Sequence, residues 1–287
     1  MVLETRFGRR IAATGLAVAG LVLARDHSKE ANQRYALEAQ QQLPPIAEHI
    51  QDRYGIDITF PTGVQNHSGK IIISEATEER KLIGARIVRA ELAKLPPSFM
   101  RNIGPKMIAL SGLIQVDYSY RLGSTHAKKS HMYLLSRDRA LLSESAERYD
   151  LQRAFHHENE HFADFSGDGS LEDNYLSDDT EWTALNGSEQ QVDRVLFFPG
   201  FVSLYSQADD GEDQAEIGAL LFAQGTDAGN EEFDSFADDQ IVQAKIDEMK
   251  RRYAMWSDGL ISDQYWIDLR AGTVDEAYWN ERDVNRD

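Results

Sequence analysis

The segment HENEH, from His157 to His161, has the residue types and the spacing of a metal-dependent hydrolase. On a helix, residues four apart lie on the same face, so both imidazole rings can point at one metal ion while Glu158 stands beside it. Zinc lowers the pKa of a bound water to about 7, and a neighbouring carboxylate can take a proton from that water as it attacks a carbonyl carbon. The pattern therefore predicts a zinc site suited to the hydrolysis of an amide bond.

A catalytic zinc usually takes three protein ligands, so a third ligand must lie elsewhere in the chain. A histidine six residues after the second one would complete one common arrangement, but Gly167 occupies that position. The segment EDQAE places Glu212 and Glu216 four residues apart on one helical face, where one can bind zinc while the other orients a ligand histidine. Asp164, seven residues after His157 on the same face, is the alternative third ligand or a partner of a ligand.

Three segments together resemble one known family. They are AFHHENEH at residues 154–161, EWTALNG at residues 181–187 and FFPGFVSLYSQADDGEDQAEIGALLF at residues 197–222. The chain resembles the zinc-binding metallopeptidases of bacteria, a gluzincin group with distant similarity to the catalytic domain of anthrax lethal factor. The resemblance extends over residues 47–256.

The resemblance implies a role for each matching residue. The implied zinc ligands are His157, His161 and Glu212, and the implied general base is Glu158. Tyr205 would donate a hydrogen bond to the developing oxyanion, and Glu216 would support a ligand histidine from behind. The implied cofactor is Zn²⁺, and the implied substrate is a peptide or protein.

The apolar pattern indicates which elements position these side chains. Leu151, Phe155, Phe162 and Phe165 could pack the histidine helix into a core, while His156 faces away from the pair. The predicted strands lie early in the chain, at residues 56–60, 70–74, 107–120 and 130–136, with a loop at 121–129. Helices are predicted at 75–95, from 143 through the histidine cluster, at 212–224 and at 238–256. This order predicts an α+β fold with a small mixed sheet followed by a mainly helical half, and the resemblance implies a single zincin-like catalytic domain at residues 46–287.

The N-terminus has the pattern of an export signal. A basic stretch, RFGRR, precedes fourteen apolar residues at 11–24, which is too short a run for a comfortable membrane span. We therefore expect residues 1–24 to be a signal peptide or an N-terminal anchor, and the protein to be exported, either periplasmic or secreted. Residues 25–45 form a polar helical lead-in that we expect to be broken at Pro44 and Pro45.

The composition limits which partners the protein can bind and which side chains can bind a metal ion. The formal net charge of -18 disfavours binding to nucleic acid or to an anionic membrane, so we expect membrane contact only through an uncleaved N-terminal segment. The chain has no cysteine, so any transition-metal site must use imidazole and carboxylate groups. The alternative is a non-catalytic zinc- or calcium-binding exported surface protein, in which the same ligands hold a structural ion. Asp164 also begins a run with the spacing of a calcium loop, although Tyr175 stands at its twelfth position. Glu158 favours the enzyme, since a structural ion needs no carboxylate beside its first ligand.

Overall fold

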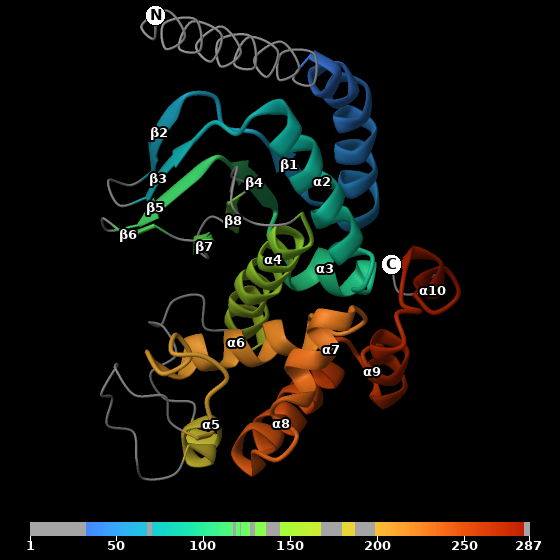
Figure 1. Ribbon diagram of the computed structural model, residues 1–287. Coiled ribbons are helices and arrows are strands. Elements are labelled where there is room, and N and C mark those ends of the chain that lie inside the picture. The colour runs from blue at the N-terminus through green and yellow to red at the C-terminus, as the bar shows by residue number, and fades with distance from the viewer. Residues whose placement is uncertain are drawn as a thin grey trace, which may run out of the picture.

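The computed structural model describes residues 33–67, 71–116, 119–120, 122–126, 130–135, 144–167, 180–186 and 199–283. The expected signal or anchor at residues 1–24 lies outside the described residues, and so do Asp168 and Tyr175 of the possible calcium loop. Figure 1 shows the strands in the upper half of the molecule, the later helices in the lower half, and the helix α4 (Glu144–Gly167) between the two. The predicted α+β class is confirmed.

The strands form two four-stranded sheets. The first has the order β1 (Asp57–Thr59), β4 (Met107–Ser111), β8 (His131–Leu135), β7 (Gly123–His126), in which β7 runs antiparallel to β8 and the other pairs are parallel. The second is antiparallel throughout, in the order β2 (Val64–His67), β3 (Ile71–Ser74), β5 (Leu113–Val116), β6 (Ser119–Tyr120). The predicted mixed sheet is the first of these, with β7 at its edge.

Two strand predictions are wrong in detail. Residues 107–120 do not form one strand, because the chain leaves the first sheet after Ser111 and enters the second at Leu113. Gly112 permits this crossing, since a Cβ atom there would lie 2.3 Å from the carbonyl oxygen of Glu75. The segment predicted as a loop at residues 121–129 contains β7, whose polar sequence Gly-Ser-Thr-His carries no apolar alternation. Pairing with β8 makes this segment a strand.

The expected break at Pro44 and Pro45 is also wrong, because one helix runs through residues 33–54. Proline in a helix leaves the carbonyl group four residues earlier without a partner. Here residues 40, 41, 44 and 45 are all exposed, so water can satisfy those carbonyl groups. The opposite face of the helix carries Ala39, Ile46 and Ile50 into the core, which holds the helix together across the prolines.

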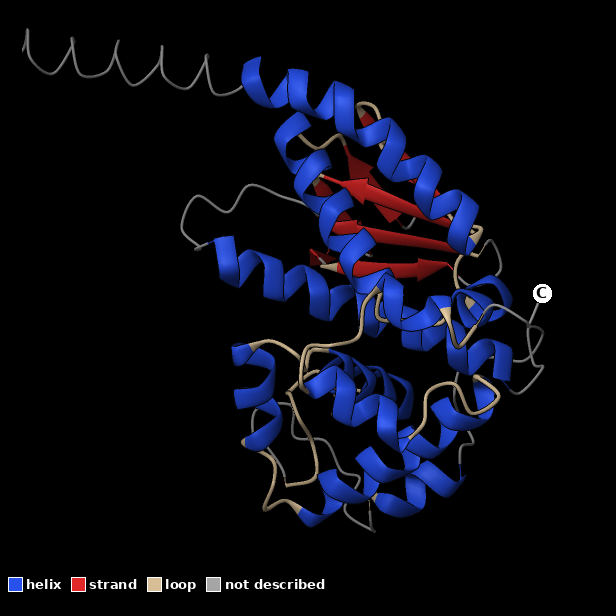
Figure 2. Cartoon of the chain, turned by 90° about the vertical axis from the view of Figure 1, so that its right-hand side faces the viewer, coloured by secondary structure: helices blue, strands red, loops and turns tan. Residues whose placement is uncertain are grey.

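Helices pack against the first sheet and against each other. The helix α2 (Glu78–Leu92) begins at Thr77, whose side chain caps it, and contacts β4; α4 contacts β7 and β8. Pro97 starts the next helix, α3 (Pro97–Ile103). Figure 2 shows helices lying along the strands and a separate helical half beneath them. That half consists of α5 (Thr180–Leu185), α6 (Asp210–Phe222), α7 (Asp227–Asp234), α8 (Gln240–Trp256) and α9 (Asp263–Arg270). The last helix, α10 (Glu276–Asn280), lies against α2 and the helix at residues 33–54, where Glu276 pairs with Arg89 and His49.

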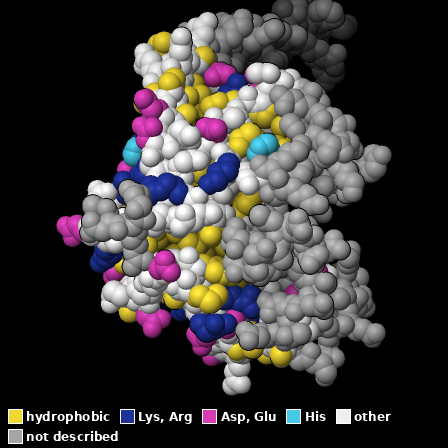
Figure 3. Space-filling model, turned by 180° about the vertical axis from the view of Figure 1, so that it is seen from behind, with side chains coloured by type: hydrophobic (Ala, Val, Ile, Leu, Met, Phe, Trp, Pro, Cys, Tyr) yellow, Lys and Arg dark blue, Asp and Glu magenta, His cyan; other side chains and the backbone are white. Residues whose placement is uncertain are grey.

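The core that fixes α4 in place is rich in aromatic rings. Leu151, Phe155 and Phe162 are buried, as their spacing predicts, and α4 packs most extensively on α6. Phe222 at the end of α6 stacks on His156 with ring centroids 4.7 Å apart. Among the helices that the structure describes, none combines the length and the apolar character needed to cross a bilayer. The face seen in Figure 3 intersperses basic, acidic and apolar side chains.

Candidate metal centre

The helix α4 places His157 and His161 on one face, one turn apart. Their rings lie 5.0 Å apart at an angle of 88°, and both residues are buried. The buried apolar residues on α4 fix its rotation, so the two imidazole rings point out of the helix toward α6. This is the geometry that the four-residue spacing predicts.

Glu212 lies in the first turn of α6 and faces both histidines. Asp209 caps this helix by accepting a hydrogen bond from the backbone N–H of Glu212 at 2.9 Å. Oε2 of Glu212 lies 3.0 Å from Nε2 of His157 and 3.6 Å from Nε2 of His161. One ligand atom from each of the three residues lies within 4.8 Å of the others, so they could hold a metal ion together.

The donor set fits zinc. Two imidazole nitrogens and one carboxylate oxygen are ligands that zinc accepts, and this set leaves a fourth position for water or substrate. Oε2 of Glu212 is buried and accepts no hydrogen bond, although Nε2 of His157 lies only 3.0 Å away. A cation shared by the three residues would require this arrangement, in which the ligand atoms face a common point and are not bonded to one another.

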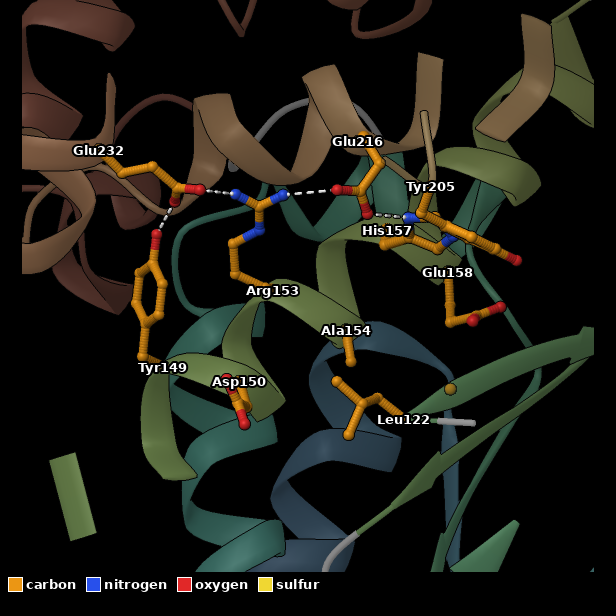
Figure 4. A pocket seen from close by; sticks show the side chains of 11 residues that line it. Leu122, Tyr149, Asp150, Arg153, Ala154, His157, Glu158, Tyr205, Glu216 and Glu232 are labelled. Atoms are coloured by element: carbon orange, nitrogen blue, oxygen red, sulfur yellow. Dashed lines mark hydrogen bonds and ion pairs between the residues drawn. The ribbon is translucent and has the colours of Figure 1, made fainter. Parts of the chain in front are cut away.

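Glu216, one turn further along α6, holds the ring nitrogen of His157 that faces away from Glu212. Nδ1 of His157 lies 2.9 Å from Oε1 of Glu216, which is hydrogen-bonding distance, and this leaves Nε2 directed at Glu212. Arg153 donates to the other oxygen of Glu216 at 2.9 Å and to Glu232 on α7 at 2.6 Å. Figure 4 shows this row of side chains from Glu232 through Arg153 and Glu216 to His157.

These contacts set the protonation of the metal-free cluster. Burial favours neutral His157, but the nearby carboxylates of Glu212 and Glu216 outweigh burial and raise the pKa of His157 to about 10. Burial opposes the charge of Glu216 as well, yet His157 and Arg153 lower the pKa of Glu216 to about 2. The two histidines likewise hold the pKa of Glu212 well below its ordinary value against the effect of burial. Both carboxylates are therefore ionised at neutral pH.

Glu158 is buried beside the histidines and is held by β7. The hydroxyl group of Thr125 donates to Oε2 of Glu158 at 2.6 Å. Gly123 on the same strand makes room for the carboxylate, since a Cβ atom there would lie 2.6 Å from Oε1 of Glu158. Burial raises the pKa of Glu158, while the neighbouring His157 and His161 and the bond from Thr125 oppose that rise.

Tyr205 approaches the cluster from the segment between α5 and α6. Its hydroxyl group donates to Oε1 of Glu212 at 2.7 Å, and its ring centroid lies 5.6 Å from that of His157. The residue is 38% exposed, which separates it from the core tyrosines of this protein. Tyr205 therefore lies at the open side of the cluster.

Other residues singled out by the sequence lie away from the three possible ligands. Asp164 is half-buried on α4 and is not part of the group formed by His157, His161 and Glu212 among the described residues. Burial raises the pKa of Glu160 to about 8, and the charge of Asp164 adds to that rise. His156 is fully buried and lies 3.0 Å from Oε2 of Glu91, in keeping with its predicted orientation away from the pair.

Sequence reasoning missed three residues of this site. Thr125 and Gly123 lie in the segment predicted as a loop, and no motif marks them. Arg153 could have been found, because it stands four residues before His157 and therefore shares its helical face. Thr125 and Gly123 contact Glu158, and Arg153 contacts Glu216, so each touches a carboxylate that the sequence motifs contain.

A cavity of about 440 Å³ opens beside the cluster. His157, Glu158 and Tyr205 bound it at one end, and Tyr149 and Glu232 at the other. Its size is within the range of small-molecule and side-chain binding pockets. The possible metal ligands therefore border a space that another molecule can enter.

Comparison with known proteins supports the fold. The sequence matches no protein-family model and no curated protein. Among solved structures, the fold is similar to that of a protein described as a "putative zinc-binding metallo-peptidase" from Bacteroides caccae. The two chains are 17% identical, with a TM-score of 0.50, over 86% of this chain and 93% of the other. The chain thus shares the fold of that protein and carries a cluster of two histidines and one glutamate that could hold a metal ion.

Proposed function

We propose that this protein is an exported zinc-dependent metallopeptidase of the gluzincin type, which hydrolyses amide bonds in peptides or proteins. The observation that carries the proposal is the convergence of His157, His161 and Glu212 within 4.8 Å, with Glu158 buried beside them. The fold shared with the Bacteroides caccae protein supports it. Residues 46–287 would form a single zincin-like catalytic domain.

In this proposal His157, His161 and Glu212 bind the zinc ion, and Glu216 keeps His157 in the orientation that binding needs. Carboxylates that hold a ligand histidine from behind also raise its basicity as a ligand. A zinc ion held there would lower the pKa of a bound water to about 7 and polarise the substrate carbonyl. Asp164 is not needed as a ligand.

Glu158 is the general base. Its carboxylate accepts the proton from the attacking water and passes it to the amide nitrogen as the carbon–nitrogen bond breaks. Burial raises its pKa toward the working pH, which suits a group that must take up and release a proton in one cycle. The 2.6 Å bond from Thr125 fixes one oxygen of Glu158 and leaves the other for the proton.

Tyr205 stabilises the negative charge that develops on the substrate carbonyl oxygen. Its hydroxyl group borders both Glu212 and the cavity, so it can donate to an oxygen atom placed there. A preorganised donor aimed at a developing charge is worth far more in the transition state than in the ground state. The partial exposure of Tyr205 leaves its side chain room to meet the substrate.

Export follows from the N-terminal pattern. Residues 1–24 would direct the chain out of the cytoplasm as a cleaved signal or retain it as an anchor. Mass spectrometry of the protein recovered from the periplasm and the medium tests this, because a cleaved chain would begin at or near Arg25. Recovery from the cytoplasm with an intact N-terminus would contradict the proposal of export.

The function is tested by metal content and turnover measured together. We expect one zinc per chain in the wild type, loss of zinc in His157→Ala and Glu212→Ala, and retention of zinc in the matched acidic variant Asp164→Ala. Glu158→Gln should keep its zinc and lose turnover on a mixed peptide library, because the ligands remain and the base does not. Zinc in the wild type without hydrolysis of any peptide would favour the non-catalytic alternative, and absence of zinc after reconstitution would remove the metal site.

A further inference from the structure

Arg153 lies on the same face of α4 as the possible zinc ligand His157, one helical turn before it. Tyr149 stands one further turn back and lies on that face as well. Figure 4 shows the side chains of all three directed at carboxylates of α6 and α7. The face of α4 that carries His157 therefore continues beyond it as a row of polar side chains.

The guanidinium group of Arg153 joins carboxylates from two different helices. Nη2 donates to Oε2 of Glu216 on α6 at 2.9 Å, and Nη1 donates to Oε1 of Glu232 on α7 at 2.6 Å. The hydroxyl group of Tyr149 donates to the other oxygen of Glu232. A guanidinium group is planar and holds its N–H groups in fixed directions, so two such bonds fix its position. Arg153 is thus held between α4, α6 and α7, and its side chain is only 15% exposed.

Both oxygens of Glu216 are engaged. Oε1 lies 2.9 Å from Nδ1 of His157, and Oε2 accepts the hydrogen bond from Arg153. A glutamate carboxylate rotates easily about its last bond, because that torsion has only a broad preference. The bond from Arg153 restricts this rotation and keeps Oε1 turned toward His157. The ring of His157 then presents Nε2 to Glu212 at 3.0 Å.

Arg153 also balances the charge of Glu216. The side chain of Glu216 is only 14% exposed, and a buried carboxylate is costly unless a partner compensates its charge. A histidine that binds zinc is neutral, so in the zinc-bound protein His157 would supply a hydrogen bond and no charge. Arg153 stays protonated at any working pH and would supply the charge.

We propose that Arg153 is a positioning residue of the metal centre, which holds His157 in its zinc-binding orientation by fixing the carboxylate of Glu216. The inference rests on the zinc site of the proposed function and adds a residue that acts on a ligand through another side chain. Glu232 anchors Arg153 from α7, so a helix that carries none of the three ligands contributes to the zinc affinity.

A double-mutant cycle on zinc affinity tests this positioning role. Zinc binding to the full chain is measured by competition with a chromophoric chelator at pH 8, because burial raises the pKa of Glu232 to about 7 and its carboxylate is ionised above that pH. Arg153→Met should weaken zinc binding about 10-fold in the wild-type background. In the Glu216→Gln background the same change should have less than about a 2-fold effect, since the side chain through which Arg153 acts is already altered.

Two results of the cycle would overturn the inference. The first is equal weakening of zinc binding in both backgrounds, because a general loss of structure acts whether or not Glu216 is present. The second is an unchanged zinc affinity in Arg153→Met itself.

Three further variants locate the effect. Arg153→Lys keeps the charge and lacks the planar fork, so it should restore only part of the lost affinity. Glu232→Gln should weaken zinc binding about 2- to 5-fold, because Arg153 loses one of its two charged partners. Arg270→Met is the matched control, since it breaks another arginine–carboxylate pair on α7, with Asp234 at 2.8 Å, and should leave the zinc affinity unchanged. Equal weakening by Arg270→Met and Arg153→Met would overturn the inference.

Failure of the inference and failure of the proposed function give different results. Zinc affinity is measured without turnover, so a wild type that binds zinc and cleaves no peptide loses the peptidase function while the cycle still decides the role of Arg153. An active, zinc-binding wild type without coupling between Arg153 and Glu216 overturns the inference alone. A wild type that binds no zinc after reconstitution overturns both.

Discussion

Replacing Thr125 by valine tests the part of the site that only the folded structure reveals. Valine keeps the shape of threonine and removes the hydroxyl group that donates to Glu158 at 2.6 Å. A hydrogen bond to a charged group contributes about 1.5 to 3 kcal/mol, and one pKa unit corresponds to about 1.4 kcal/mol. Since this bond favours the ionised carboxylate, its loss should raise the pKa of Glu158 by about 1 to 2 units.

The assay is the pH dependence of kcat/KM together with zinc content. A general base must be ionised in the free enzyme, so the acidic limb of the profile should move upward by about 1 to 2 pH units in Thr125→Val. Thr125→Ser, which keeps a hydroxyl group, should restore most of the shift. Thr273→Val is the control, because that hydroxyl group donates to the backbone carbonyl oxygen of Asp268 on α9 and not to a residue of the cluster. An unmoved acidic limb would refute the role given to Thr125, and loss of zinc would show that β7 supports the metal ligands instead.

Four further predictions follow from the same contacts. Glu216→Gln should weaken zinc binding about 10- to 100-fold in equilibrium dialysis, because His157 loses its charged support; unchanged affinity would contradict this. Tyr205→Phe should lower kcat about 10- to 1000-fold with unchanged zinc content, and an unaltered rate would remove the residue from catalysis. Zinc binding at pH 7.5 should release about one proton, because the pKa of His157 is about 10 without metal and a ligand imidazole must be neutral. Calorimetry in buffers of different ionisation enthalpy would detect the proton, and a binding enthalpy independent of the buffer would contradict the prediction. Lys245→Met should lower the free energy of unfolding by about 3 to 5 kcal/mol in urea denaturation, because it leaves Asp213 buried without its ion-pair partner at 2.7 Å. A decrease of less than about 1 kcal/mol would contradict this prediction.

The Lys245 prediction concerns the frame of the site. Lys245 on α8 and Asp213 on α6 are both fully buried. Lys245 also donates to the carbonyl oxygen of Gly200, and Trp182 donates to Asp213 at 2.8 Å. This network joins α5, α6, α8 and the start of the segment that carries Tyr205, so its loss should affect the position of Tyr205 as well as stability.

The elements with a strong local signal were predicted well. The histidine helix, the α6 helix and the strands β3 and β8 lie where their apolar patterns place them, because the spacing of apolar residues along the chain sets which face of an element is buried. The predictions that failed depend on partners distant in sequence. The strand β7 exists through pairing with β8, the chain enters the second sheet at Leu113 through pairing of β5 with β3, and the helix at residues 33–54 continues past its two prolines because its other face packs in the core.

The sequence by itself determined that the imidazole rings of His157 and His161 share one face of a helix with Glu158 beside them, since four-residue spacing acts within a single turn. The spacing alone offered Glu212, Glu216 and Asp164 for the rest of the site, and the family resemblance implied Glu212 as the third ligand with Asp164 as the alternative. Only the tertiary structure brings Glu212 within 3.0 Å of His157, sets Glu216 behind that ring and leaves Asp164 outside the group. The physical reason is that α4 and α6 pack together although their site residues are about fifty positions apart in the chain. A local sequence pattern does not contain the information about which side chains such packing brings into contact.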